Sequence, residues 1–409
     1  MVTTAEHPAR PDALARTERP RRFLADLAGQ SAFAHIGPNW FAAVMGTGIV
    51  ANAAATLPGR TPALHMFAVV VWVLAMATLV AVSAATALHW LLNRNTARSH
   101  LGNPVMSHFY GAPAMALMTV GAGAVLLGGP GIGMVAAVGL DAVLWTAGTM
   151  LGLCTPVAIP YRAFTSHDNR PESAFGGWLM PVVPPMVSAA TGTLLIPHLR
   201  PGQAQLTMEL GCYAMFGLTL VASLIVVTTI WGRLVQHKVG AAAAVPTLWI
   251  VLGPVGQSIT AAHNLGDSAP TVLPEPFGVV FRAAGMVYGV PMWGFAMLWL
   301  ALAAAITVRT ARRHLPFTLT WWSFTFPVGT VVTGTSALAA TTGAQAFAVA
   351  AVALYIGLLA AWVIVAGRTV RGVWHGALLL APGTAVNRRS HALTAARPEQ
   401  PGTRPTRDR

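Results

Sequence analysis

The chain has 409 residues, of which 55% are hydrophobic and only 9% are charged, whereas soluble globular domains are about 25% charged. With a mean hydropathy of +0.61, this composition excludes an ordinary soluble protein and predicts a polytopic membrane protein. The net charge of +13 does not indicate nucleic-acid binding, because the basic residues lie in the terminal segments and in every second loop rather than in one patch.

In chain order, the sequence predicts a disordered basic cytoplasmic tail over 1–37, a transmembrane domain over 38–367 and a second basic cytoplasmic tail over 368–409. The first tail lacks the apolar core of a cleavable signal peptide. Apolar stretches of about the 20 residues that a membrane span requires predict ten spans, at roughly 38–57, 63–91, 104–128, 132–157, 176–198, 206–233, 242–264, 282–308, 317–341 and 344–367.

The basic residues predict the orientation of these spans. With ten spans, all but three of the 25 Lys and Arg residues fall on one side, and the exceptions are Arg60, Arg200 and Arg282. Because cytoplasmic loops are enriched in Lys and Arg, both termini are expected in the cytoplasm, with the protein in the plasma membrane. A missed or extra span would scramble this asymmetry, so it also supports the count of ten.

Odd-numbered and even-numbered spans differ in their helix breakers. Every odd span combines proline with glycine or other small residues, and we expect helix kinks at Pro113, Pro184, Pro254 and Pro327. Backbone groups freed by such breaks survive at membrane depth only inside protein or along a wet cavity. The predicted fold is therefore an all-α integral membrane protein, with ten transmembrane helices forming five helical hairpins in a quasi-fivefold ring around a central pore. Packing of each kink against a neighbouring helix is the alternative.

The predicted inner helices carry neutral hydrogen-bond donors and almost no charge. This lining favours small anions, because cation pathways usually show acidic rings or carbonyl filters. The expected pore-lining residues include Asn39, Thr47, Gln257, Ser258 and Thr330, although each hydroxyl could equally bond to its own helix.

Two phenylalanines beside Pro327 are candidates for a pore gate. Phe326 adjoins the proline and Phe324 lies two residues earlier. The two side chains are about 200° apart on a helix, so they cannot face the same way. An aromatic ring across a narrow apolar constriction would block hydrated ions, whereas lipid-facing packing is the alternative for each.

Catalytic and metal-binding patterns are missing from the sequence. The two cysteines, Cys154 and Cys212, match no metal spacing and indicate no disulfide framework. No paired His, Asp or Cys motif suggests a membrane-embedded enzyme, so no catalytic residue, metal or cofactor is expected. A receptor-like or structural protein is a further alternative, but it would not need a break in every odd helix.

Two stretches, "PNWFAAVMGTGIV" (Pro38–Val50) and "WWSFTFPVGT" (Trp321–Thr330), resemble the tellurite-resistance/dicarboxylate transporter family. That family includes a plant slow anion channel, a fungal malate permease and a fungal sulfite efflux pump. The resemblance implies a homotrimer of five-hairpin pores, with Phe326 as the occluding residue. It also implies that Gly46, Thr47 and Gly48 allow close helix packing and expose backbone to the pore.

On this resemblance, the expected function is transport of a small anion across the lipid bilayer, either a C4-dicarboxylate such as malate or sulfite. A passive channel for chloride or nitrate is the alternative, and a membrane-embedded enzyme is a remote one. If transport is coupled to protons, Asp141 and His263 are the candidate proton carriers.

Overall fold

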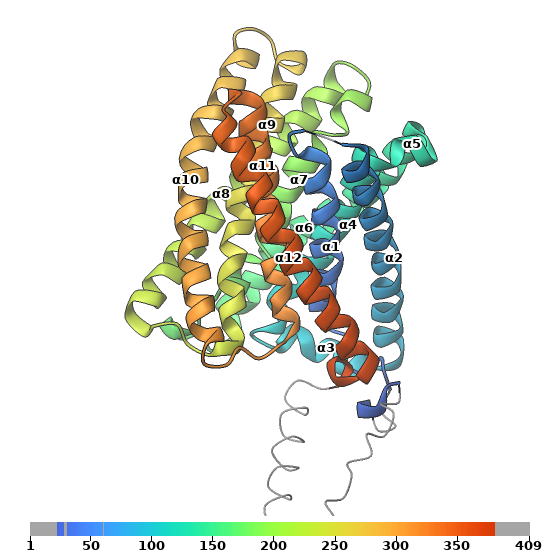
Figure 1. Cartoon of the computed structure of the whole chain (residues 1–409), viewed down its shortest axis with the longest axis vertical. Coiled ribbons are helices and arrows are strands. Elements are labelled where there is room, and N and C mark those ends of the chain that lie inside the picture. Colours follow the sequence, from blue (N-terminus) through green and yellow to red (C-terminus); the bar gives the residue numbers. More distant parts are fainter. Residues whose placement is uncertain (1–22, 28–30, 60, 381–409) are drawn as a thin grey trace, which may run out of the picture.

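The computed structural model describes residues 23–27, 31–59 and 61–380, and these residues form helices and connecting turns without a β-strand (Figure 1). The α-helices are α1 (Phe41–Thr56), α2 (Pro62–Leu92), α3 (Arg94–Gly102), α4 (Gly111–Gly123), α5 (Gly129–Ile132), α6 (Met134–Thr165), α7 (Pro184–Gly192), α8 (Gln203–His237), α9 (Leu252–Val272), α10 (Phe277–Ala311), α11 (Phe326–Thr342) and α12 (Gln345–His375). The all-helical prediction is confirmed.

Seven helical segments of the described chain are long and apolar enough to cross a membrane, compared with the ten expected spans. The expected spans 38–57, 176–198 and 317–341 contain only the shorter helices α1, α7 and α11. These α-helices have 16, 9 and 17 residues, fewer than the roughly 20 residues of a continuous membrane helix. The segment 265–281, which the expected spans leave as a loop, is mostly helical, because α9 continues to Val272 and α10 begins at Phe277.

Each of the five odd-numbered expected spans begins with a 3-10 helix, and an α-helix follows it. These 3-10 helices are η2 (Pro38–Trp40), η3 (Met106–Tyr110), η6 (Gly176–Leu179), η8 (Ala242–Val251) and η9 (Leu319–Phe324). Four prolines lie within the first three residues of the α-helix that follows, namely Pro113, Pro184, Pro254 and Pro327. At these positions the missing amide costs little, because it would have no intrahelical partner.

The helices of the odd-numbered expected spans lie inside, namely α1, α4, α7, α9 and α11. The long helices of the even-numbered expected spans lie outside, namely α2, α6, α8, α10 and α12. In α1, 14 of 16 residues are buried, compared with five of 31 in α12. The most apolar windows of α2, α6, α8, α10 and α12 are only 22% to 33% buried, whereas those of Met106–Ile132 and Ala242–Val272 are 61% and 78% buried. In Figure 1, α2 and α10 flank the molecule, with α1, α7 and α11 between them.

The inner helices contact one another in a closed circle: α1 packs on α4, α4 on α7, α7 on α9, α9 on α11 and α11 on α1. Glycine makes the closest approaches possible. A Cβ on Gly256 of α9 would lie 2.5 Å from the amide nitrogen of Val331 on α11. A Cβ on Gly111 of α4 would overlap the carbonyl oxygen of Met180.

Aromatic side chains of the outer helices donate hydrogen bonds to the inner helices. Trp72 Nε1 on α2 donates to the carbonyl oxygen of Val120 on α4 at 3.0 Å. Trp145 Nε1 on α6 donates to the carbonyl oxygen of Ser188 on α7 at 3.0 Å. Trp299 Nε1 on α10 likewise reaches Leu248 O of η8 at 2.8 Å. These indole groups satisfy part of the inner backbone without water.

The two ends of the described chain lie together (Figure 1). The amide of Leu24 donates to the carbonyl oxygen of Trp374 at 2.9 Å, and η1 (Ala25–Leu27) contacts η10 (Ala377–Leu379). Part of each expected tail therefore has a defined structure, because Leu27 and Leu379 bury apolar surface. The remaining tail residues, 1–22, 28–30 and 381–409, lie outside the described residues.

Candidate functional site

A central cavity of about 260 Å³ is lined by all five inner helices. We call it the vestibule. Its lining residues come from the C-terminal parts of α1, α4 and α7 and from α9 and α11. In chain order, the polar ones are Asn52, Thr56, Thr119, Thr191, Gln257, Thr260, His263, Asn264, Thr333 and Ser336.

Phe326 lies at the inner end of the vestibule. It is the first residue of α11, and the next lining residue of that helix is Thr333. Two helical turns separate them, so Phe326 lies about 10 Å deeper along the axis. Its side chain is 2% exposed. On the side of Phe326 away from the vestibule, Gly46 of α1 lies so close to the residue before Phe326 that an added Cβ would overlap the Thr325 hydroxyl. α1 and the chain before α11 are therefore closely packed behind the Phe326 ring.

Among the described residues, the polar lining offers hydroxyl and amide groups and one imidazole, and no carboxylate or permanent cation. Asn52 Nδ2 donates to the carbonyl oxygen of Thr119 at 2.9 Å, and the hydroxyls of Thr260 and Thr333 are 2.8 Å apart. The Ser336 hydroxyl is buried and has no hydrogen-bond partner among the described residues. A buried hydroxyl without a partner costs free energy, and an anion in the vestibule could accept its hydrogen bond.

His263 lies at the mouth of the vestibule within a charged group. His263 Nε2 is 3.4 Å from Asp267 Oδ2, and Arg282 Nε is 3.3 Å from Asp267 Oδ1. His263 Nδ1 is 2.8 Å from the Thr341 hydroxyl. The His263 side chain is 18% exposed and that of Asp267 is 52% exposed. In the lining, His263 is thus the titratable group, and its neighbours fix the orientation of its ring.

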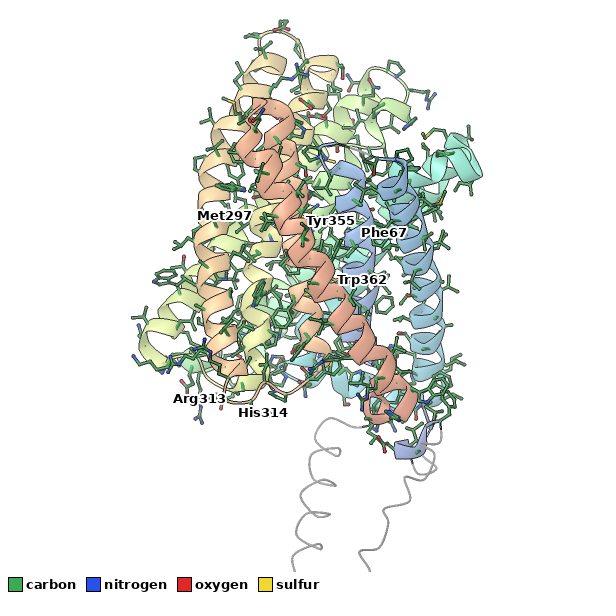
Figure 2. The ribbon with its side chains drawn as sticks, viewed as in Figure 1. Phe67, Met297, Arg313, His314, Tyr355 and Trp362 are labelled. Carbon is green, nitrogen blue, oxygen red and sulfur yellow. The ribbon has the colours of Figure 1, made fainter. Side chains whose placement is uncertain are left out.

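Several residues expected in the pore face neighbouring helices instead. The Thr47 hydroxyl accepts a hydrogen bond from Trp362 Nε1 of α12 at 3.2 Å. The Ser258 hydroxyl accepts one from the Tyr288 hydroxyl of α10 at 2.8 Å. The Thr330 hydroxyl donates toward carbonyl oxygens of α9 and of its own helix. Figure 2 labels Trp362 and Tyr355 on α12, the helix that crosses in front of α1.

Three further residues from the first expected span lie outside the vestibule lining. Asn39 is in η2, at the N-terminal end of the first inner segment. A Cβ on Gly46 would overlap the Thr325 hydroxyl of the α11 segment, and one on Gly48 would lie 2.8 Å from Thr119 Cγ2 of α4. Both glycines are therefore packing positions between inner segments.

Phe324 and Asp141 also lie away from the vestibule. Phe324 packs edge-on against Trp249 and Trp321, with ring centroids 5.2 and 5.6 Å away. Asp141 of α6 is fully buried against α4, and neither carboxyl oxygen has a partner among the described residues. Of the two candidate proton carriers, only His263 lines the vestibule.

Sequence reasoning missed Asn52, Thr119 and Ser336 as lining residues. Asn52 was detectable, because it is the one amide side chain within the apolar run of α1. Ser336 follows a series of threonines, and no local pattern distinguishes its orientation from theirs.

A polytopic membrane protein whose central cavity is lined by neutral donors has the features of an anion channel or anion transporter. The family model described as "Voltage-dependent anion channel" matches residues 35–370. The chain therefore belongs to the voltage-dependent anion channel family, and the family prediction drawn from Pro38–Val50 and Trp321–Thr330 is confirmed.

Curated relatives are named as transporters. The chain is 29% identical over 346 residues to the sulfite efflux pump SSU1 of Arthroderma otae, covering 83% of this chain and 91% of the relative. It is also 29% identical to the sulfite efflux pump SSU1 of Trichophyton rubrum, with the same coverage. An uncharacterised transporter of Methanocaldococcus jannaschii is 28% identical over 297 residues, 72% of this chain and 81% of the relative.

Proposed function

We propose that this protein moves sulfite across the cell membrane through the vestibule, and that Phe326 occludes the pathway. The observation that carries the proposal is a cavity to which all five inner helices contribute and whose deepest lining residue is one buried aromatic ring. The names of the relatives in Arthroderma and Trichophyton support sulfite over the dicarboxylate alternative.

The lining chemistry suits transient binding of a small oxyanion. Hydroxyl and amide donors can replace part of the anion's hydration shell, while the lack of Lys and Arg in the lining keeps binding weak enough for release. The volume of about 260 Å³ accommodates an anion of this size together with several waters, since one water occupies about 30 Å³.

The architecture proposed for transport is the quasi-fivefold ring of ten spans over 38–367, with both termini cytoplasmic. The closed circle of inner contacts supports the ring. The position of Arg313 at the same end as the described chain termini supports the orientation (Figure 2). A homotrimer, with each subunit holding its own pore, is the proposed assembly.

A passive inorganic anion channel is the second candidate, favoured by the description of the matching family model. Reconstitution into liposomes distinguishes the candidates. We expect sulfite uptake down its own gradient, with malate, chloride and nitrate as comparison anions and with and without a pH gradient. Chloride or nitrate currents that exceed sulfite flux would favour the channel. Acceleration by a pH gradient would indicate proton coupling through His263, and no flux of any anion would refute the pore.

A further inference from the structure

A second cavity lies outside the vestibule, between the outer helices α10 and α12. Its volume is about 630 Å³, and its lining includes Trp249, Trp293, Met297, Trp321, Leu354 and Ala361. We call it the lateral groove. Its floor is formed by Trp249 of η8, by Trp321 and Phe324 of η9 and by Val328 of α11. In Figures 1 and 2, α10, which carries Met297, and α12 diverge toward the end of the molecule that carries Arg313.

The lateral groove is long, narrow and apolar. Along α12 its lining runs from Ala350 to Val365, which is about 22 Å of helix. α10 and α12 are both candidate membrane spans with largely exposed surfaces, so the groove opens toward lipid. Its one polar lining side chain besides the indoles is Thr307, whose hydroxyl already accepts a hydrogen bond from Trp249.

A basic cavity continues the lateral groove along α12. It also has a volume of about 630 Å³, and its lining includes Arg368, Arg371 and His375 of α12 together with Phe317 and Asp26. The two arginines are exposed and form no ion pair with any other residue in the described part of the chain. The positive side chains outnumber the one acid in this lining.

One tryptophan joins the two cavities. Trp321 lines the lateral groove, and the Arg368 guanidinium lies 4.7 Å from the centroid of its ring. Val365, the last groove residue of α12, is three positions before Arg368, so the two side chains share a helix face. The lateral groove therefore leads directly to two arginines near the C-terminal end of α12. Tryptophan residues such as Trp321 are typical of the membrane interface, so this end of the groove is expected at headgroup level.

We propose that an anionic phospholipid binds here, with an acyl chain in the lateral groove and its phosphate on Arg368 and Arg371. Charge complementarity selects this occupant, because a zwitterionic lipid would bring a cationic headgroup to the same arginines. The site faces the cytoplasmic leaflet in the proposed orientation. Lipid binding at this site does not depend on which anion the vestibule carries.

Bound lipid would also support the segment that carries Phe326. Phe324 and Val328, the residues two positions before and after Phe326, both line the lateral groove. An acyl chain there fills the outer side of this segment, while the vestibule lies on its inner side.

Native mass spectrometry of the full-length protein tests the proposal. The detergent-solubilised protein is titrated with dioleoylphosphatidylglycerol or with dioleoylphosphatidylcholine, which has the same acyl chains. We expect preferential retention of phosphatidylglycerol. The double variant Arg368→Gln/Arg371→Gln should weaken its apparent Kd about thirtyfold, from the loss of two arginine contacts. The variant Arg94→Gln/Arg98→Gln removes the same charge from exposed positions on α3 and should change little.

A second pair of variants tests the groove itself. Gly357 lines the lateral groove and Gly367 does not, and an added Cβ at either position on α12 meets no atom within 4 Å. Gly357→Phe should displace phosphatidylglycerol, while Gly367→Phe should retain it with the same thermal midpoint. Three results would each overturn the proposal: equal retention of the two lipids, an equal loss of phosphatidylglycerol affinity in the two arginine variants, or unchanged phosphatidylglycerol binding in Gly357→Phe. Dissociation of an oligomer in Gly357→Phe would also overturn the proposal, because a second copy of the protein would then occupy the groove.

Discussion

Replacing Phe326 by alanine should increase anion flux. In the proposed pathway the ring must leave its buried position before an ion can pass, and in that position only 2% of its surface is exposed. Burial of a phenylalanine side chain stabilises a protein by about 1.5–3 kcal/mol. If the closed state holds the ring with this free energy, removing the ring lowers the barrier by a similar amount. Flux should then rise by roughly 10- to 100-fold, since each 1.4 kcal/mol corresponds to a factor of ten.

Sulfite and chloride fluxes into liposomes containing equal amounts of folded protein provide the assay for Phe326→Ala. Phe324→Ala is the matched control, because it makes the same substitution on the wall of the lateral groove. We expect no rise in flux for Phe324→Ala. Equal increases in both variants would refute the reasoning, since loosened packing near α11 would then suffice. A folded Phe326→Ala protein with unchanged flux would show that the ring does not limit passage.

Three further variants test the packing, the lining and a histidine of α3. Gly256→Ala should destabilise the protein by about 1–3 kcal/mol through overpacking against α11. Gly253→Ala is the control, because an added Cβ there meets no atom within 4 Å. Equal thermal midpoints for the two variants would contradict the overpacking. Ser336→Ala should raise the KM for the transported anion up to about tenfold by removing one hydrogen bond, and an unchanged KM would exclude that contact. Burial and the neighbouring His89 lower the pKa of His100 in the folded protein. As the pH falls below about 6.5, this histidine is protonated in the unfolded chain before it is protonated in the folded protein. The folded state therefore loses stability relative to the unfolded state. The thermal midpoint should therefore fall less between pH 7 and pH 5 in His100→Gln than in the wild type, and parallel curves would argue against this role.

The layering of the helices was predictable from the sequence, because helix breakers at membrane depth require a protein environment. The proline positions predicted which segments lie inside, as the burial of α1 and α9 shows. They did not predict the form of the break. Each inner segment changes from 3-10 to α-helix, and in four of them a proline lies within the first three residues of the α-helix. Three inner segments are not among the candidate membrane spans.

The orientation of individual side chains was not predictable from residue type. Gln257 and Ser258 are adjacent polar residues, yet Gln257 lines the vestibule and Ser258 bonds to Tyr288 of α10. The rotation of α9 about its axis decides between them, and that rotation depends on glycine contacts with α11 that are distant in sequence. Phe324 and Phe326 were expected on different faces for reasons of helical geometry, and they line different cavities.

The hydrogen bonds from outer aromatic side chains have a kinetic consequence. An inner helix that rotates or slides must break its bond to the outer layer or move that layer against lipid. Three indoles each join one outer helix to one inner segment, namely those of Trp72, Trp145 and Trp299. Rotation of one phenyl ring needs none of these changes. If the pathway opens by movement of Phe326 as proposed, the backbone should remain almost unchanged. Distance measurements between labelled helices would then detect little difference while anion flux changes greatly.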